Sequence, residues 1–235
     1  MLRFYKKAIL SLILTSVSVF SFSAMVQATE DKIVPWQNMF VEGSSEALVK
    51  LAIYYGQNAA EPDPQRAFDL LLVASSKFND PVAQTNLGLL YQFGQGVDID
   101  YARAAYWYQR AAKLNNVDAH VKLGDMYSRG VGTSTNFEKA ANLYREAADN
   151  GSSDAQVELG YIYEVGDLGA VDYTAAMELY QKAADQGHQI GQYNLAEMFE
   201  LGKGVSIDLD QARKWYGLSA NQGLQEATEA LQRLK

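Results

Sequence analysis

The 235-residue chain contains no cysteine, which excludes disulfide bonds, thiolate metal sites and a cysteine-linked lipid anchor. Proline occurs only four times, and so low a content favours helices. Histidine occurs only at His120 and His188, and neither has a second histidine or a carboxylate at the sequence spacing that metal sites use. The sequence therefore predicts no metal ion and no cofactor, and a fold that is stabilised by packing.

Basic residues are fewer than acidic ones: the chain has 20 Lys and Arg and 28 Asp and Glu side chains, which gives a formal charge of −8. No run rich in Lys or Arg occurs, so nucleic acid is excluded as a partner, since binding phosphates needs a basic face. The usual motifs of serine and zinc hydrolases are also absent. The carboxylates are spread along the chain without an assignable acid–base pair. The chain is predicted not to be an enzyme, with a cell-wall-active hydrolase of unrecognised type as the alternative.

The first 28 residues have the three-part plan of a secretory signal peptide. Three basic side chains among the first seven residues precede an apolar run at 8–22, and small residues follow up to Ala28. We expect cleavage after Ala28 and export to the periplasm, with secretion from the cell also open. An uncleaved membrane anchor is the alternative, because the uncharged stretch 8–27 is about 20 residues long. Cleavage removes three positive charges and no negative ones, leaving a body of charge −11 without membrane contact.

The chain repeats itself with a period of 36 residues. One column of leucines keeps this spacing throughout: Leu51, Leu87, Leu123, Leu159, Leu195 and Leu231. Alanine or glycine stands four residues before each leucine, and an aromatic residue stands four residues after the first five. This spacing places the three residues on one stripe of a helix. Each repeat is therefore predicted to begin with an amphipathic helix.

A second helix is predicted in each repeat from the residues that start and stop helices. Glycine stands three residues after the aromatic residue, where a left-handed helix stop is expected: Gly94, Gly130, Gly166 and Gly202. Typical N-cap residues follow: Asp100, Asn136, Asp172 and Asp208. The tandem Gly-x-Gly pairs lack a third glycine and follow a helix, so they indicate a helix stop and not a phosphate-binding loop. In the second helices we expect Trp107 and Trp215 to be the costliest side chains to truncate.

The repeat register predicts the organisation of the whole chain. After the signal peptide at 1–28 it places an N-terminal linker or cap at 29–45, an atypical first repeat at 46–81, further repeats at 82–116, 117–152, 153–188 and 189–224, and a C-terminal capping helix at 225–235. The first repeat is atypical because Asn58 replaces the glycine and prolines precede its second helix. The fourth departs from the Gly-x-Gly turn at Asp167-Leu168-Gly169.

These elements resemble the Sel-one-like repeat family, a relative of the tetratricopeptide repeats. The resemblance is best in the second repeat, at Leu87-Gly88, Tyr91, Gly94-Gln95-Gly96-Val97, Trp107-Tyr108 and Ala111-Ala112. It extends over residues 46–235. The resemblance implies an all-α fold, a right-handed α-solenoid superhelix of stacked antiparallel helical hairpins. It further implies that the concave side binds proteins, and it implies no reaction.

The side of each first helix opposite the leucine stripe is predicted to line a partner-binding groove. Positions −2, +2 and +6 from the leucine lie there, and their residues change from repeat to repeat while including large apolar side chains. The candidate groove residues are Leu89, Phe93, Asp125, Arg129, Tyr161, Val165, Tyr193 and Glu197. Burial of several of them between neighbouring repeats is the alternative. The sequence thus predicts a monomeric scaffold or adaptor that binds a protein or peptide in an envelope complex; a secreted factor that binds a host protein is the alternative.

Overall fold

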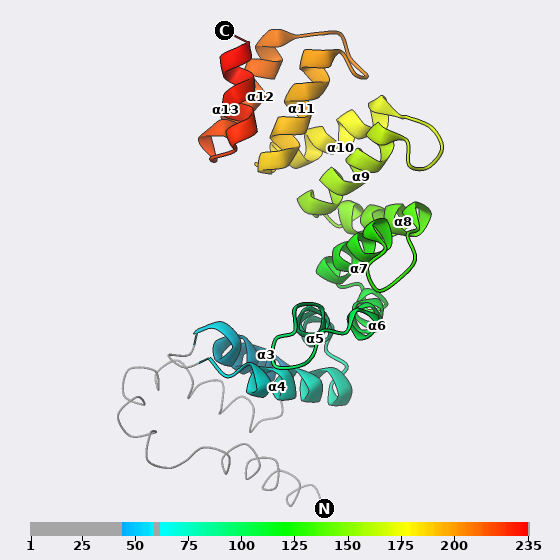
Figure 1. The fold of residues 1–235 in the computed structure, drawn as a ribbon, viewed down its shortest axis with the longest axis vertical. Coiled ribbons are helices and arrows are strands. Elements are labelled where there is room, and N and C mark those ends of the chain that lie inside the picture. Colours follow the sequence, from blue (N-terminus) through cyan, green and yellow to red (C-terminus); the bar gives the residue numbers. More distant parts are fainter. Residues whose placement is uncertain (1–43, 59–61, 235) are drawn as a thin grey trace, which may run out of the picture. The chain divides into compact units, whose positions relative to one another are not determined.

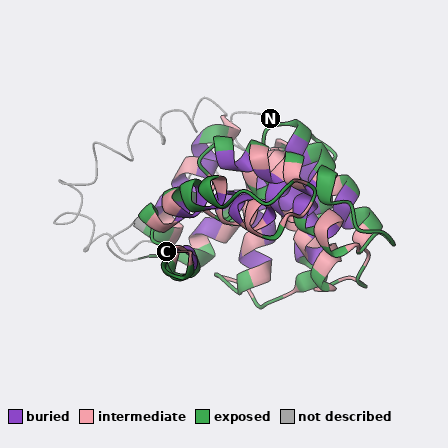
Figure 2. Ribbon diagram, turned by 90° about the horizontal axis from the view of Figure 1, so that it is seen from above, coloured by how far each residue is buried: buried purple, intermediate pink, exposed green. Residues whose placement is uncertain are grey.

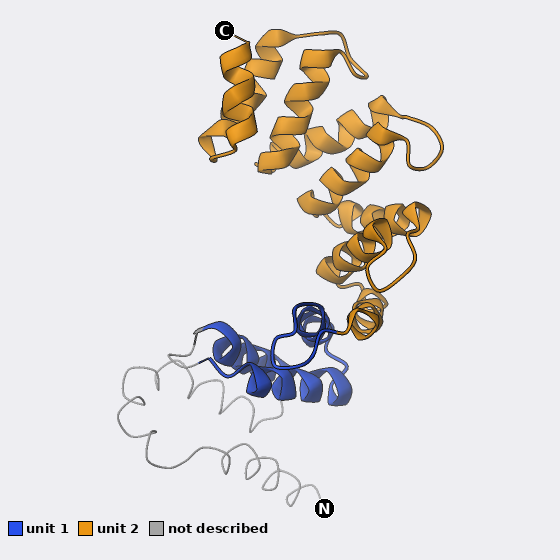
Figure 3. Cartoon of the chain, viewed as in Figure 1, with its two compact units in different colours: residues 1–99 blue, residues 100–235 orange. Residues whose placement is uncertain are grey.

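The computed structural model describes residues 44–58 and 62–234, and every regular element within them is a helix (Figure 1). The predicted signal peptide at 1–28 lies outside the described residues, as does most of the predicted linker. The chain divides into two compact units, residues 1–99 and residues 100–235 (Figure 3). Each unit is a stack of antiparallel helices in which every helix packs against the next one along the chain, which confirms the predicted all-α solenoid of helical hairpins.

Unit 1 contains the atypical first repeat and the first helix of the second repeat. Its helices are α3 (Ser45–Ile53), a short π-helical segment η1 (Tyr54–Asn58), α4 (Pro64–Lys77) and α5 (Pro81–Phe93). The regular repeats end their first helix at a glycine, whereas in this repeat η1 follows the first helix. The backbone amide of Asp63 donates to the carbonyl oxygen of Tyr55 over 2.8 Å. Asp63 then caps α4 by accepting from the amide of Arg66, with proline in the favoured first helical position.

Unit 2 contains three complete repeats, preceded by α6 and followed by a single terminal helix. Its helices are α6 (Tyr101–Ala112), α7 (Val117–Arg129), α8 (Phe137–Asp149), α9 (Ser153–Val165), α10 (Tyr173–Asp185), α11 (Gln189–Leu201), α12 (Leu209–Asn221) and α13 (Gln225–Arg233). The first helices of the repeats are α7, α9 and α11, and the second helices are α8, α10 and α12. Because α9 also contacts α11, successive first helices are neighbours in space.

Helix ends lie where the sequence places them. The first helices α5, α7, α9 and α11 all end at a glycine in the left-handed conformation, with φ between 67° and 79°. The second helices of the regular repeats start at Asp or Asn side chains that accept from backbone amides in the first turn. These caps satisfy amides that a helix start would otherwise leave unpaired.

The second glycine of the Gly-x-Gly turn has a role in stacking that the sequence analysis did not assign. A Cβ atom on Gly132 would lie 2.7 Å from the backbone of Tyr101, and one on Gly204 would lie 2.8 Å from that of Tyr173. The turn of one repeat therefore packs against the start of the preceding second helix, and only glycine fits. In the fourth repeat this position is Leu168, which is exposed.

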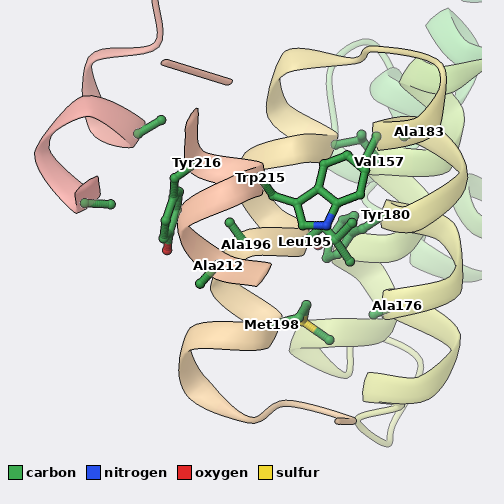
Figure 4. Close-up of a cluster of buried hydrophobic side chains, with 13 residues drawn as sticks. Val157, Ala176, Tyr180, Ala183, Leu195, Ala196, Met198, Ala212, Trp215 and Tyr216 are labelled. Carbon is green, nitrogen blue, oxygen red and sulfur yellow. The ribbon is translucent and has the colours of Figure 1, made fainter. Parts of the chain in front are cut away.

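The core follows the tyrosines of the second helices, which are among the largest fully buried side chains: Tyr108, Tyr144, Tyr180 and Tyr216. Buried residues occur on the helix faces that meet in the stack (Figure 2), and Figure 4 shows Tyr216 and Trp215 with Leu195 and Met198 in one such cluster. Trp215 is buried, whereas Trp107 is only half-buried, so the high cost of truncation expected for a fully buried tryptophan stays a prediction for Trp215 and does not extend to Trp107. It lies one residue, about 100° of helix, from the buried Tyr108 and packs beside Tyr106 and Arg110.

Candidate protein-binding surface

The exposed side of the first helices in unit 2 carries a set of residues at equivalent positions, which we call the variable face. It consists of positions −1, +2 and +6 from the leucine in three successive repeats: Lys122, Asp125, Arg129, Glu158, Tyr161, Val165, Asn194, Glu197 and Leu201. All nine side chains are exposed or half-buried. At about 100° per residue these three positions occupy one sector of the helix. The first helices α9 and α11 contact each other, and the charge of Asp125 on α7 acts on Glu158 on α9.

Five of the eight predicted groove residues meet on the variable face of unit 2: Asp125, Arg129, Tyr161, Val165 and Glu197. Tyr161 and Val165 are exposed, at 54% and 43%. Leu89 and Phe93 lie on α5 in unit 1, where Leu89 is half-buried and Phe93 is exposed. The structure thus places the predicted residues at +2 and +6 at the surface, and their role in binding stays a prediction.

At position −2 the structure follows the alternative, burial between neighbouring elements, for Val121 and Val157, whereas the role of the half-buried Tyr193 stays a prediction. Val121 is 6% exposed and Val157 is 7% exposed, while Tyr193 is half-buried against the ring of Tyr216 at a centroid distance of 5.4 Å. The physical reason is that a first helix in a stack is covered from two sides, by its own second helix and by a neighbouring repeat. The exposed sector is therefore narrower than half of the helix and includes position −1, which sequence reasoning missed.

Two carboxylates of the variable face carry a charge that nothing nearby compensates fully. Burial raises the pKa of Glu158, and the negative charge of Asp125 adds to the increase, although Arg129 and His188 oppose it. Burial likewise raises the pKa of Glu197, followed by the charge of Glu164, although the charge of Lys203 and a hydrogen bond from the Tyr193 hydroxyl oppose the increase. Within the described part of the chain, neither carboxylate has a cation within ion-pair distance. Both groups are less favourable when ionised than an exposed glutamate would be.

Two other glutamates on the same helices are compensated and have a structural role. Glu164 accepts from the hydroxyl of Tyr180 over 2.8 Å and from Lys203 Nζ over 2.7 Å. Glu200 accepts from the hydroxyl of Tyr216 over 2.7 Å and from Arg233 Nη2 over 2.8 Å. Each glutamate thereby accepts a hydrogen bond from the hydroxyl of a buried tyrosine and connects its own helix with the helix of the tyrosine and the segment that carries the cation.

In the third repeat the tyrosine hydroxyl is satisfied differently, because Tyr144 donates to Asp125 Oδ1 over 2.8 Å and lies 3.3 Å from Ser128 Oγ. Burial is the main cause that raises the pKa of Tyr144, Tyr180 and Tyr216, so these hydroxyls remain neutral donors. Sequence reasoning missed the pairing, although an acid stands 16 residues before the tyrosine in the fourth and fifth repeats. This repeated spacing of 16 residues is the sequence feature that could have predicted the pairing.

Both histidines have a carboxylate partner that lies far away in the sequence. His120 Nε2 is 2.8 Å from Glu146 on α8, and its Nδ1 is 2.8 Å from the carbonyl of Asn116. His188 accepts the amide of Gly191 on Nδ1, which caps α11, and its Nε2 lies 2.9 Å from Asp154. No group of three or more His, Asp or Glu side chains among the described residues could hold a metal ion.

The repeat architecture matches a known family along most of the chain. The model of the Sel1 repeat matches residues 45–77, 81–116, 117–152, 153–188 and 189–224. The chain belongs to the Sel1 repeat family. Proteins of this family are protein-interaction scaffolds, and their fold is typically not catalytic. A comparison with curated proteins found no significant match. No helix within residues 44–58 and 62–234 is long and apolar enough to cross a membrane.

Solved structures share the fold of this Sel1 repeat protein. The crystal structure of a Sel1 repeat protein from Oxalobacter formigenes is 28% identical with a TM-score of 0.76, and the match covers 85% of this chain and 88% of that one. A putative Sel1 repeat protein from Klebsiella pneumoniae is 22% identical with a TM-score of 0.56, covering 86% and 98%. An immunity protein from Pseudomonas aeruginosa, Pa5087, is 22% identical with a TM-score of 0.56, covering 80% and 72%. At these identities the last two show the fold alone.

Proposed function

We propose that this Sel1 repeat protein is an exported, non-catalytic scaffold that binds a protein or peptide on the variable face of unit 2. Through this binding it regulates or assembles a complex in the bacterial envelope. The observation that carries the proposal is the contrast between positions within one helix. Core positions repeat with little change, whereas the variable face presents a different residue at each equivalent place, several of them exposed and apolar.

The exposed residues of the variable face have the chemistry of interface anchors. Tyr161 and Leu201 are each 54% exposed, and Arg129 is also exposed. Exposed clusters of large apolar side chains mark interaction sites, and Tyr and Arg are enriched among residues that dominate binding energy. Because these side chains extend from rigid stacked helices, little conformational entropy is lost when a partner binds.

Support for export comes from the sequence of residues 1–28, which has the basic, apolar and small-residue regions of a signal peptide. The absence of cysteine means that the protein needs no oxidative folding after it crosses the membrane. We place the protein in the periplasm, and fractionation of the native cells into cytoplasm, periplasm and medium tests that placement.

Crosslinking in the native cell, followed by affinity purification and mass spectrometry, tests the binding site. The site variant combines Tyr161→Asp with Leu201→Asp, which removes two apolar anchors. A matched control combines Tyr106→Asp and Leu218→Asp on the second helices α6 and α12, where the side chains are 53% and 41% exposed. We expect the site variant to lose the crosslinked partner and the control to keep it. Retention of every partner by a site variant with a wild-type circular dichroism spectrum would falsify the proposal.

A further inference from the structure

The variable face has an apolar strip that no part of the described chain covers. Val165 on α9 and Leu201 on α11 occupy the same repeat position, and α9 and α11 contact each other. Tyr161, one turn before Val165 on α9, extends the strip along the helix. Exposures of 54%, 43% and 54% for Tyr161, Val165 and Leu201 leave an apolar surface of adjacent helices open to solvent.

Carboxylates lie directly beside this strip, at the positions −1 and +2 of the same helices. Glu158 precedes Tyr161 by one turn of α9, and Glu197 precedes Leu201 by one turn of α11. Each is half-buried, and each interacts electrostatically with a carboxylate on the neighbouring first helix, Asp125 for Glu158 and Glu164 for Glu197. Negative charge is thus concentrated at the edge of an apolar surface, where partial desolvation strengthens its attraction for a cation.

Among the described residues, a cation is in direct contact with each of the two glutamates that have a structural role, but not with Glu158 or Glu197. Glu164 has Lys203 and Glu200 has Arg233, both at direct hydrogen-bonding distance. Glu158 and Glu197 have no such partner among the described residues. Basic side chains occur on the variable face only on α7, as Lys122 and Arg129. Arg129 and His188 act on Glu158 only electrostatically, and Glu197 has the Tyr193 hydroxyl as a hydrogen-bond partner and Lys203 as a cation that acts electrostatically. Each carboxylate can therefore still accept a cation of another molecule in direct contact.

We propose that the variable face binds a basic amphipathic segment of a partner protein. Its Lys or Arg side chains pair with Glu158 and Glu197, and its apolar side chains pack on Tyr161, Val165 and Leu201. This inference rests on the proposed function and specifies the chemistry of the partner. Charge complementarity favours this occupant, because the whole chain carries a net charge of −8, or −11 after the expected cleavage, and a second copy would bring the same net negative charge. Nucleic acid and anionic lipid are disfavoured for the same reason.

The segment can be matched to the size of the face. Packed helices lie about 8–10 Å apart, so three first helices span about 20 Å, and a helix of about 18 residues is about 27 Å long. A helical peptide of that length, with Lys and Leu on one side at i, i+3 and i+4 spacing, covers the face. The probe is this synthetic peptide with a fluorescent label. Two control peptides replace every Lys with Glu, or every Leu with Ser.

Fluorescence anisotropy with the purified protein measures the affinity. We expect the Lys/Leu peptide to bind and both control peptides to bind at least about tenfold more weakly. The double variant Glu158→Gln/Glu197→Gln should weaken binding by about 30-fold or more and reduce its salt dependence. A matched control, Glu138→Gln/Glu178→Gln, removes two exposed carboxylates from α8 and α10 and so makes the same change in net charge. It should bind within about twofold of wild type.

Three outcomes would overturn the basic-segment proposal. The first is an equal loss of affinity in the control double variant, which would mean attraction by net charge alone. The second is tight binding of the Glu/Leu peptide. The third is a dimer in sedimentation analysis that Glu158→Gln/Glu197→Gln strengthens, which would identify a second copy as the occupant. If Tyr161→Asp/Leu201→Asp abolishes capture of the native partner while the glutamine variants leave it unchanged, the proposed function stands and this inference fails. If neither variant affects capture, both fail.

Discussion

Replacing Gly160 with alanine is expected to destabilise the protein, although alanine is the better helix former. Gly160 lies in α9 opposite the ring of Tyr180, and a Cβ atom at this position would be 2.7 Å from a ring carbon. The ring has no room to retreat, because Tyr180 is fully buried and its hydroxyl donates to Glu164 over 2.8 Å. Either the ring or the helix must move.

The magnitude follows from two opposing terms. Alanine gains about 1 kcal/mol over glycine inside a helix. Inserting a methyl group into a packed core costs about 1–3 kcal/mol, and a fixed aromatic ring places this case near the upper end. The free energy of unfolding should therefore fall by about 2 kcal/mol. Gly217→Ala in α12 is the matched control, since nothing lies within 4 Å of a Cβ there, and it should gain about 1 kcal/mol.

Urea unfolding followed by circular dichroism measures both variants against wild type under one condition. The two substitutions have the same chemistry, so their difference of about 3 kcal/mol isolates the contact with Tyr180. A Gly160→Ala protein as stable as wild type would refute the packing of α9 on α10. The variant Tyr180→Leu removes the ring. In the Tyr180→Leu protein, Gly160→Ala should lower the free energy of unfolding much less than in wild type, and a double-mutant cycle measures this difference.

Three further predictions concern charge, packing and export. Burial and neighbouring charges raise the pKa of Glu158 above 4.5, so the folded protein holds this proton more tightly and loses stability as the pH rises through that range. Glu158→Gln should therefore stabilise the free protein at pH 7 by about 0.5 kcal/mol, and the gain should vanish below pH 4.5; a gain that persists in urea titrations at pH 4 would contradict the electrostatic origin. Trp215→Ala should cost about 3–5 kcal/mol and the half-buried Trp107 clearly less, so equal losses in thermal melts would argue against the packing of the terminal repeat. N-terminal sequencing of the exported protein should begin at Thr29, and a sequence that begins at Met1 would instead indicate an uncleaved anchor.

The fold could be predicted because helix starts, helix stops and the buried stripe are local patterns that recur every 36 residues. Gly130 and Asn136 fix the ends of two helices through their own backbone and side chain, so neighbours in sequence were sufficient. The atypical first repeat was also visible, since its prolines and missing glycine are local features. What the local pattern does not contain is which helix covers which face.

The surface was therefore predicted only in part. Helical periodicity alone places Val157 and Tyr161 on the same open side, whereas stacking buries Val157 and leaves Tyr161 exposed. The same limit applies to charged residues, because the pairing of Glu164 with Tyr180 depends on contact between two helices. The unpaired state of Glu158 is evident only after the cations nearby are located in space.

The pairing of Glu164 and Glu200 bears on how an array of this kind changes its length during evolution. The cation for Glu164 is Lys203, which belongs to the following repeat, whereas the cation for Glu200 is Arg233 on α13. In the third repeat the position of Glu164 is occupied by Ser128, which needs no cation. Correspondingly, in the fourth repeat the position of Lys203 is occupied by Asp167. A duplication of the fifth repeat would carry both acid and cation and preserve every pair. Loss of α13 would instead leave a half-buried glutamate beside Tyr216 without its cation, so insertion of a repeat before α13 is tolerated more readily than removal of α13.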